Sequence, residues 1–275
     1  MLETYHEDAA AVATPEQAGF DPIERIAGDL DRGLLIICDH AANALPPEYG
    51  SLGLGPEDLA RHIGYDIGAG ALTRALAARL GVPALLTTFS RLLIDPNRGE
   101  DDPTLLMRLS DGAIIPGNAR ADAAEKQRRL TRYYRPYHDA INAAIDAGVE
   151  RGRPPAVFSV HSYTPVWRGW PRPWHAGILW DNDPRFAVPL IDKLRADPHL
   201  VVGDNEPYTG ALKNDTLYRH GTRRGIAHAL LEVRQDLIAD DEGVGEWTDR
   251  LEPILTEILE IPDLNEIRHF GSRCG

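Results

Sequence analysis

Cysteine is scarce in this chain, and long apolar segments are absent from it. The 275 residues include two cysteines, Cys38 within an apolar run and Cys274 beside the carboxyl end. A disulfide framework is therefore not expected, whereas a reducing compartment such as the cytoplasm is. No basic and apolar leader opens the sequence, and no apolar run reaches membrane-spanning length. We therefore expect no membrane partner.

Basic residues are fewer than acidic ones. Lys and Arg number 29 against 42 Asp and Glu, which gives a formal net charge of -13 and disfavours nucleic acid as a partner.

The G-x-S-x-G turn of serine hydrolases is missing as well. The 43% hydrophobic content is enough for a large core. We predict a lead-in segment over residues 1–30 and a single domain over 31–275.

Short apolar runs alternate with helical patterns along the chain. Residues 33–38 and 156–160 read as strands buried on both faces of a sheet. Further strands are expected at 84–89, 92–94, 177–180, 200–202 and 227–233. Helices are expected at 56–81, broken near 64–70, at 121–149, bent or divided at Pro136, and at 184–196, 214–223 and 244–260. This alternation predicts an α/β fold with a mixed, largely parallel sheet covered on both faces.

Histidines and acids follow or lie within several of these strands. His40 and His161 each end a buried run, the loop Asp95–Arg98 follows another, and Glu232 lies within the last strand. The carboxyl ends of strands converge on one crevice in such sheets. Two histidines and a carboxylate there would supply three ligands to a zinc ion, and a further carboxylate would act as general base. The alternative for Glu232 is a buried ladder of ion pairs with its neighbours in the strand.

An ordered series of motifs carries a resemblance to a known family. The motifs are C-D-H-A-A-N-A-L-P around His40, H-I-G-Y-D-I-G-A around Asp66, S-R with D-P-N-R over 90–98, H-S-Y-T-P from His161, D-N-E-P-Y over 204–208 and E-V-R-Q-D-L-I from Glu232. From about residue 33 to 260 the chain resembles the N-formylglutamate amidohydrolases, in the branch known as predicted N-formylglutamate amidohydrolases.

The resemblance implies a fold and several residue roles. The family is similar to the zinc carboxypeptidases and aspartoacylases, which implies a three-layer α/β/α domain. By that kinship His40 and His161 are the first and last metal ligands and Glu232 is the general base. Asn97 and Arg98 correspond to the pair that holds a substrate carboxylate.

The middle metal ligand departs from the carboxypeptidase pattern. Asn43 stands where H-x-x-E would place a glutamate, and an amide is a poor zinc ligand. Asp66 is the replacement that we expect, because a helix break there would direct its carboxylate inward. His62 lies four residues earlier and is the alternative, as a ligand or as a partner of one.

The expected activity is hydrolysis of an N-acyl amino acid with Zn²⁺ or another divalent transition metal as cofactor. N-formyl-L-glutamate is the first substrate to consider, with Arg91, Tyr208 and Arg234 as further substrate-binding residues. The segment 167–174, rich in Trp, Arg and Pro, would wall or cover the pocket. The alternatives are a deacylase for another N-acyl amino acid and a non-catalytic carboxylate-binding protein. A homo-oligomer is compatible with the sequence.

Overall fold

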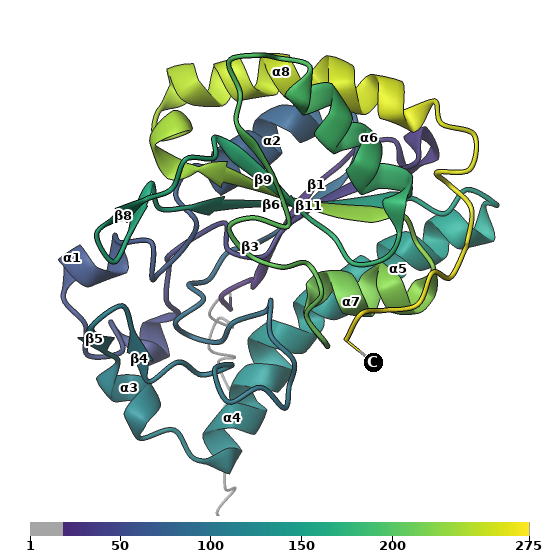
Figure 1. Ribbon diagram of the computed structural model, residues 1–275. Helices are drawn as coiled ribbons and strands as arrows, with labels where there is room; N and C mark the ends of the chain where they lie inside the picture. The colour runs from purple at the N-terminus through teal and green to yellow at the C-terminus, as the bar shows by residue number, and fades with distance from the viewer. Residues whose placement is uncertain (1–18, 275) are drawn as a thin grey trace, which may run out of the picture.

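A seven-stranded sheet forms the centre of the molecule (Figure 1). The computed structural model describes residues 19–274. In sheet order, the strands are β1 (Ile23–Ile26), β3 (Ala84–Thr87), β2 (Leu34–Cys38), β6 (Ala156–Tyr163), β11 (His228–Arg234), β9 (Ala176–Leu179) and β10 (Val202–Asp204). Strands β3, β2, β6 and β11 are parallel, β9 and β10 run the opposite way, and β1 is antiparallel to β3. The predicted mixed and largely parallel sheet is confirmed.

Helices cover both faces of this sheet. Helices α2 (Ala69–Leu80), α6 (Pro184–Arg195) and α8 (Asp241–Leu259) pack on one face, and α5 (Arg135–Glu150) and α7 (Thr216–His220) on the other. Strand β2 shows why, since Ile36 belongs to the first core cluster and the next residue, Ile37, to the second. Successive side chains of a strand point to opposite faces. The fold therefore has the three α/β/α layers that the resemblance implied.

The remaining elements are short. They are the helices α1 (Pro56–Leu59), α3 (Pro116–Ala119) and α4 (Ala123–Arg129), the hairpin of β4 (Leu109–Ser110) with β5 (Ala113–Ile114), and the hairpin of β7 (Val166–Trp167) with β8 (Trp170–Pro171). None of the helices within residues 19–274 combines the length and the apolar character needed to cross a bilayer.

Both cysteines are free thiols, as their number and positions predicted. Cys38 ends strand β2 inside the core, and burial raises the pKa of its thiol. A buried neutral thiol is a poor nucleophile. Cys38 is therefore a packing residue.

The predicted break in the helix over 56–81 is present and is the feature that positions Asp66. Helix α1 ends at Leu59 and α2 begins at Ala69. Gly68, between them, has a φ of 81°, and a Cβ there would lie 2.1 Å from the backbone oxygen of Ile238. Only glycine fits such a position without strain. The turn lets the Asp66 backbone N–H donate to the His40 carbonyl over 2.9 Å, so the two residues lie together.

Some predicted elements differ from those observed. The strand expected at 92–94 is wrong: these residues form a turn, and they are buried because they pack in two small apolar clusters rather than in a sheet. Strand β1 lies within the predicted lead-in segment, of which residues 1–18 fall outside the described part. Pro136 does not divide the long helix. Instead α4 continues through a π-helical segment, Leu130–Tyr134, into α5. The wider π-helical turn accommodates the missing N–H of Pro136.

Candidate active site

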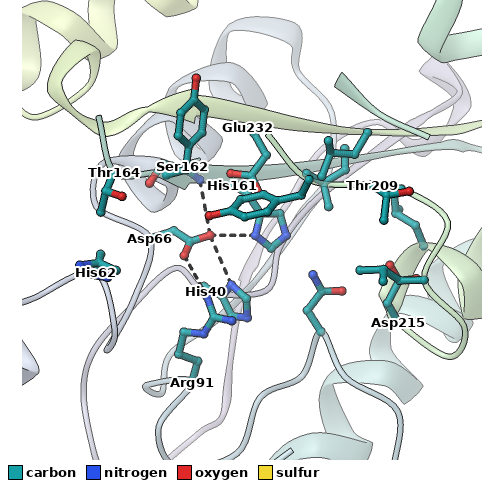
Figure 2. Close-up of a pocket in the computed structure, with 18 of the residues that line it drawn as sticks. His40, His62, Asp66, Arg91, His161, Ser162, Thr164, Thr209, Asp215 and Glu232 are labelled. Atoms are coloured by element: carbon teal, nitrogen blue, oxygen red, sulfur yellow. Dashed lines mark hydrogen bonds and ion pairs between the residues drawn. The ribbon is translucent and has the colours of Figure 1, made fainter. Parts of the chain in front are cut away.

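The two histidines lie at the carboxyl ends of neighbouring parallel strands. His40 follows β2, and His161 lies inside β6, which extends to Tyr163 and so is longer than predicted. Asp66 comes from the segment between α1 and α2 and reaches between the two rings (Figure 2). The predicted convergence of these residues at one edge of the sheet is what the structure shows.

His40, Asp66 and His161 form a buried cluster with the geometry of a metal site. Their ligand atoms lie within 4.8 Å of one another. One Asp66 oxygen, Oδ2, lies 2.8 Å from Nδ1 of His161 and 3.3 Å from Nδ1 of His40. Burial alone would raise the pKa of Asp66, but the adjacent His40 and His161 outweigh it and hold the pKa below its usual range. Asp66 is thus an anion that faces two imidazole nitrogens.

The far nitrogen of each imidazole contacts a second carboxylate. Nε2 of His40 lies 2.7 Å from Asp95, and Nε2 of His161 lies 3.2 Å from Asp39. A carboxylate that accepts the Nε2–H keeps Nδ1 free as an electron-pair donor and fixes the orientation of the ring. Two such nitrogens and one carboxylate are a donor set that suits zinc and similar divalent ions. The residues present therefore fit a divalent metal ion.

Glu232 lies beside His161 on the neighbouring strand. In the parallel pairing of β11 with β6, Glu232 is opposite His161, so both side chains project from the face that α5 and α7 cover. Glu232 is 7% exposed and lines the pocket, and its Oε2 has no hydrogen-bond partner among residues 19–274. Burial raises the pKa of this carboxyl group to about 7. Arg234 pairs with Asp236 rather than with Glu232, so the ion-pair ladder considered from the sequence does not form.

Two of the predicted substrate-binding residues, Arg91 and Arg98, differ in their interaction partners. Arg91 pairs with Asp95 over 2.7 Å and lies 3.4 Å from Asp66, so its charge is already balanced within the protein. Arg98 donates to the carbonyl of Asn97 over 2.8 Å and has no carboxylate partner among the described ion pairs. Both arginines line the pocket. Of these two arginines, Arg98 is the one that remains able to hold a carboxylate of a ligand.

The other predicted residues divide between the pocket and its surroundings. Asn97 and Tyr208 line the pocket, and Arg172 lies over the Tyr208 ring. The structure does not bring Arg234 into the pocket lining. The Trp-rich segment 167–174 forms the hairpin of β7 with β8, and of its aromatic residues Trp167 reaches the pocket.

The two alternatives for the middle ligand lie outside the cluster. His62 lines the pocket, but its Nε2 faces Asp111 at 3.5 Å, and it is not among the residues whose ligand atoms converge. Asn43 donates to the carbonyl of Leu59 and does not line the pocket. Within residues 19–274, Asp66 is the carboxylate that joins the two histidines.

The roles of Asp39 and Asp95 were not predicted from the sequence. Asp95 contacts His40 and also pairs with Arg91. Asp39 directly precedes His40 in the chain but contacts His161 instead. The signal that could have found them is two acids at strand ends near two candidate ligand histidines, because ligand imidazoles commonly have a carboxylate partner.

A second pair of histidines supports the loop that carries Asn97 and Arg98. Nε2 of His138 donates to the carbonyl of Pro96 over 3.1 Å, and its Nδ1 lies 2.8 Å from Nε2 of His220. Both rings are buried and stacked. Burial, followed by the nearby Arg219, lowers the pKa of His220 to about 3. The pair is therefore neutral in the folded protein at ordinary pH.

Acid should weaken the fold through this pair. Between pH 6.5 and about 3 the unfolded chain binds a proton on His220 that the folded chain does not, so stability falls as the pH falls. Between pH 7 and pH 5 this loss is about 2 kcal/mol for one histidine. Between pH 7 and pH 5 we expect the free energy of unfolding of His220→Asn to fall by about 2 kcal/mol less than that of the wild type. Urea unfolding at the two pH values measures this difference. His199→Asn, at an exposed histidine, is the control. If the free energy of unfolding fell equally in both variants between the two pH values, the prediction would be contradicted.

These features together are those of a hydrolase. A donor set for a metal ion, a carboxyl group with a pKa near neutrality and an arginine that has no carboxylate partner among the described ion pairs meet in one pocket at the carboxyl edge of an α/β/α sheet. The model of the N-formylglutamate amidohydrolase family matches residues 32–239, which is well over half of the chain. The chain therefore belongs to the N-formylglutamate amidohydrolase family and is a hydrolase of that kind.

Solved structures share the fold of this chain. The crystal structure of gene product Atu2144 from Agrobacterium tumefaciens is 31% identical in sequence, and the match covers 89% of this chain and 97% of that one, with a TM-score of 0.82. N-formylglutamate amidohydrolase from Ralstonia eutropha JMP134 is 24% identical over 88% of this chain and 98% of that one, with a TM-score of 0.66, and so shares the fold. A comparison with curated proteins finds no match.

Proposed function

We propose that this protein is a metal-dependent hydrolase that cleaves the amide bond of an N-acyl amino acid. His40, Asp66 and His161 hold a divalent ion, with zinc as the first candidate. The observation that carries the proposal is the buried cluster of these residues beside Glu232, whose Oε2 has no hydrogen-bond partner in the described part of the chain. We place the activity in the cytoplasm, where free thiols such as Cys38 persist.

The chain's own residues divide the work of hydrolysis. When bound, a divalent ion supplies a Lewis acid that polarises a carbonyl group and acidifies water. Glu232 accepts a proton from the attacking water and delivers it to the nitrogen of the leaving amine, for which a pKa near 7 is well suited. Arg98 and Asn97 hold the carboxylate of the amino acid, which orients the scissile bond. Asp39 and Asp95 keep the two imidazoles in place.

N-formyl-L-glutamate is the first substrate to assay, because the family bears its name. The test combines turnover with metal analysis of the purified protein. We expect about one divalent ion per chain, release of formate from N-formyl amino acids, and loss of turnover on chelation that the same ion restores. A protein that binds such compounds without releasing the amine would be a carboxylate-binding protein, and the proposed function would be wrong.

A further inference from the structure

The pocket that contains the metal cluster extends well beyond it. Its volume is about 450 Å³. His62 and Thr164 lie on one side of the cluster, and Thr209 and Asp215 lie on the opposite side, as Figure 2 shows. The cavity therefore has two ends, with the reacting atoms between them.

Four leucines line the pocket, and we call them the leucine lobe: Leu179, Leu212, Leu217 and Leu230. Leu212 and Leu217 lie on either side of Asp215 in the chain. Leu230 lies two residues before Glu232 on the same face of β11, and Leu179 pairs with it on β9. Leu217 comes from α7, which covers that face. Leu212 belongs to the loop before α7 and is 40% exposed. A ligand bound at Glu232 would therefore lie next to an apolar wall formed by these leucines.

Arg98 lies next to this lobe. Asn97, Arg98, Leu212 and Asp215 border both the main pocket and a smaller adjoining cavity. An amino acid whose carboxylate is held by Arg98 would thus direct its side chain toward the leucines. The lobe is therefore within reach of the side chain of an amino acid whose carboxylate Arg98 holds.

Of the two arginines in the pocket lining, one is left to pair with a ligand carboxylate. The arginines in the pocket lining are Arg91 and Arg98, and Arg91 is already paired with Asp95 and Asp66. Asp215, which caps α7 by accepting from the N–H of Tyr218, brings a buried carboxyl group of its own into the lobe. A side-chain carboxylate placed among the four leucines would lose its hydration, which is unfavourable.

We propose that the substrates are N-acyl amino acids with an apolar side chain, aliphatic or aromatic, which the leucine lobe binds while Arg98 holds the α-carboxylate. This rests on the proposed function and names the substrate class of the same site. Hydrolysis of such a compound adds the oxygen of water to the acyl carbon and a proton to the amine, as in the mechanism above.

The experiment compares a matched panel of N-formyl amino acids on the metal-loaded protein. N-formyl-L-leucine and N-formyl-L-phenylalanine carry apolar side chains. N-formyl-L-glutamate and N-formyl-L-glutamine have side chains of nearly the same shape, of which only that of glutamate is charged. We expect kcat/KM for the leucine compound to exceed that for the glutamate compound by roughly tenfold or more, with glutamine between them. The same panel with acetyl in place of formyl allows for a larger acyl group.

A variant pair locates the preference in the lobe. Leu212→Arg introduces a cation at a partly exposed pocket position and should lower the leucine-to-glutamate ratio at least tenfold, roughly the size of one such contact. Leu109→Arg, at an exposed leucine in β4 outside the pocket, should leave the ratio unchanged. A wild-type preference for N-formyl-L-glutamate would overturn this inference and leave the proposed function standing. Absence of turnover on every compound would overturn the proposed function and the inference with it.

Discussion

Glu232→Gln is expected to lower kcat by about 10²–10⁴ while the bound metal stays at the wild-type level. The amide has nearly the same shape as the carboxylate but cannot accept the proton of the attacking water. Glu232 is not among the residues whose ligand atoms converge on a metal position, so its exchange should not empty the site. The measurement pairs steady-state kinetics on an N-formyl amino acid with metal analysis of the same preparation.

The control for this variant is Glu246→Gln, an exposed acid on helix α8. It should keep both the rate and the metal. Wild-type rates in Glu232→Gln would remove this residue from the mechanism. Loss of the metal from that variant would instead make Glu232 a ligand, and the general base would have to be sought elsewhere in the pocket.

The parts of the fold that could be predicted from the sequence are those with a local signal. Strand β2 is a continuous apolar run and β6 begins with a largely apolar one, because both faces of these strands are covered, and such runs are readable in the sequence. The histidines that end or follow these runs were placed at one edge of the sheet because parallel strands end together. Leu92–Ile94 gave the same apolar signal, yet they pack in side clusters, because burial alone does not imply pairing with a neighbouring strand.

Other features depend on contacts between distant residues. Gly68 directs Asp66 inward because its backbone meets Ile238, which is far away in the sequence, and no local pattern shows such a contact. The partner of His161 is Asp39 and that of His40 is Asp95, a pairing that adjacency in the chain would not suggest. The leucine lobe gathers residues from two strands, a loop and a helix, so its apolar character appears only in three dimensions.

Asp66 is the ligand for which the sequence left an alternative, and a paired experiment on metal-induced stabilisation tests it. A ligand that binds the folded state alone stabilises it by about 2.7 kcal/mol at one hundred times its Kd, which corresponds to several degrees in Tm for a chain of this size. We expect wild-type protein to gain such a shift from added Zn²⁺ over its chelated form. Asp66→Asn should gain almost none at the same concentration, because the carboxylate that joins the two imidazoles is gone.

His62→Ala is the matched comparison, because His62 lines the same pocket but faces Asp111 instead of the cluster. It should keep the wild-type shift. Each variant is compared with its own chelated sample, so a change in intrinsic stability from removing a buried charge near Arg91 does not enter the result. The reverse pattern, a full shift in Asp66→Asn and none in His62→Ala, would transfer the third ligand to His62. It would also mean that the segment between α1 and α2 rearranges when the metal binds, because in this structure His62 does not converge with His40 and His161.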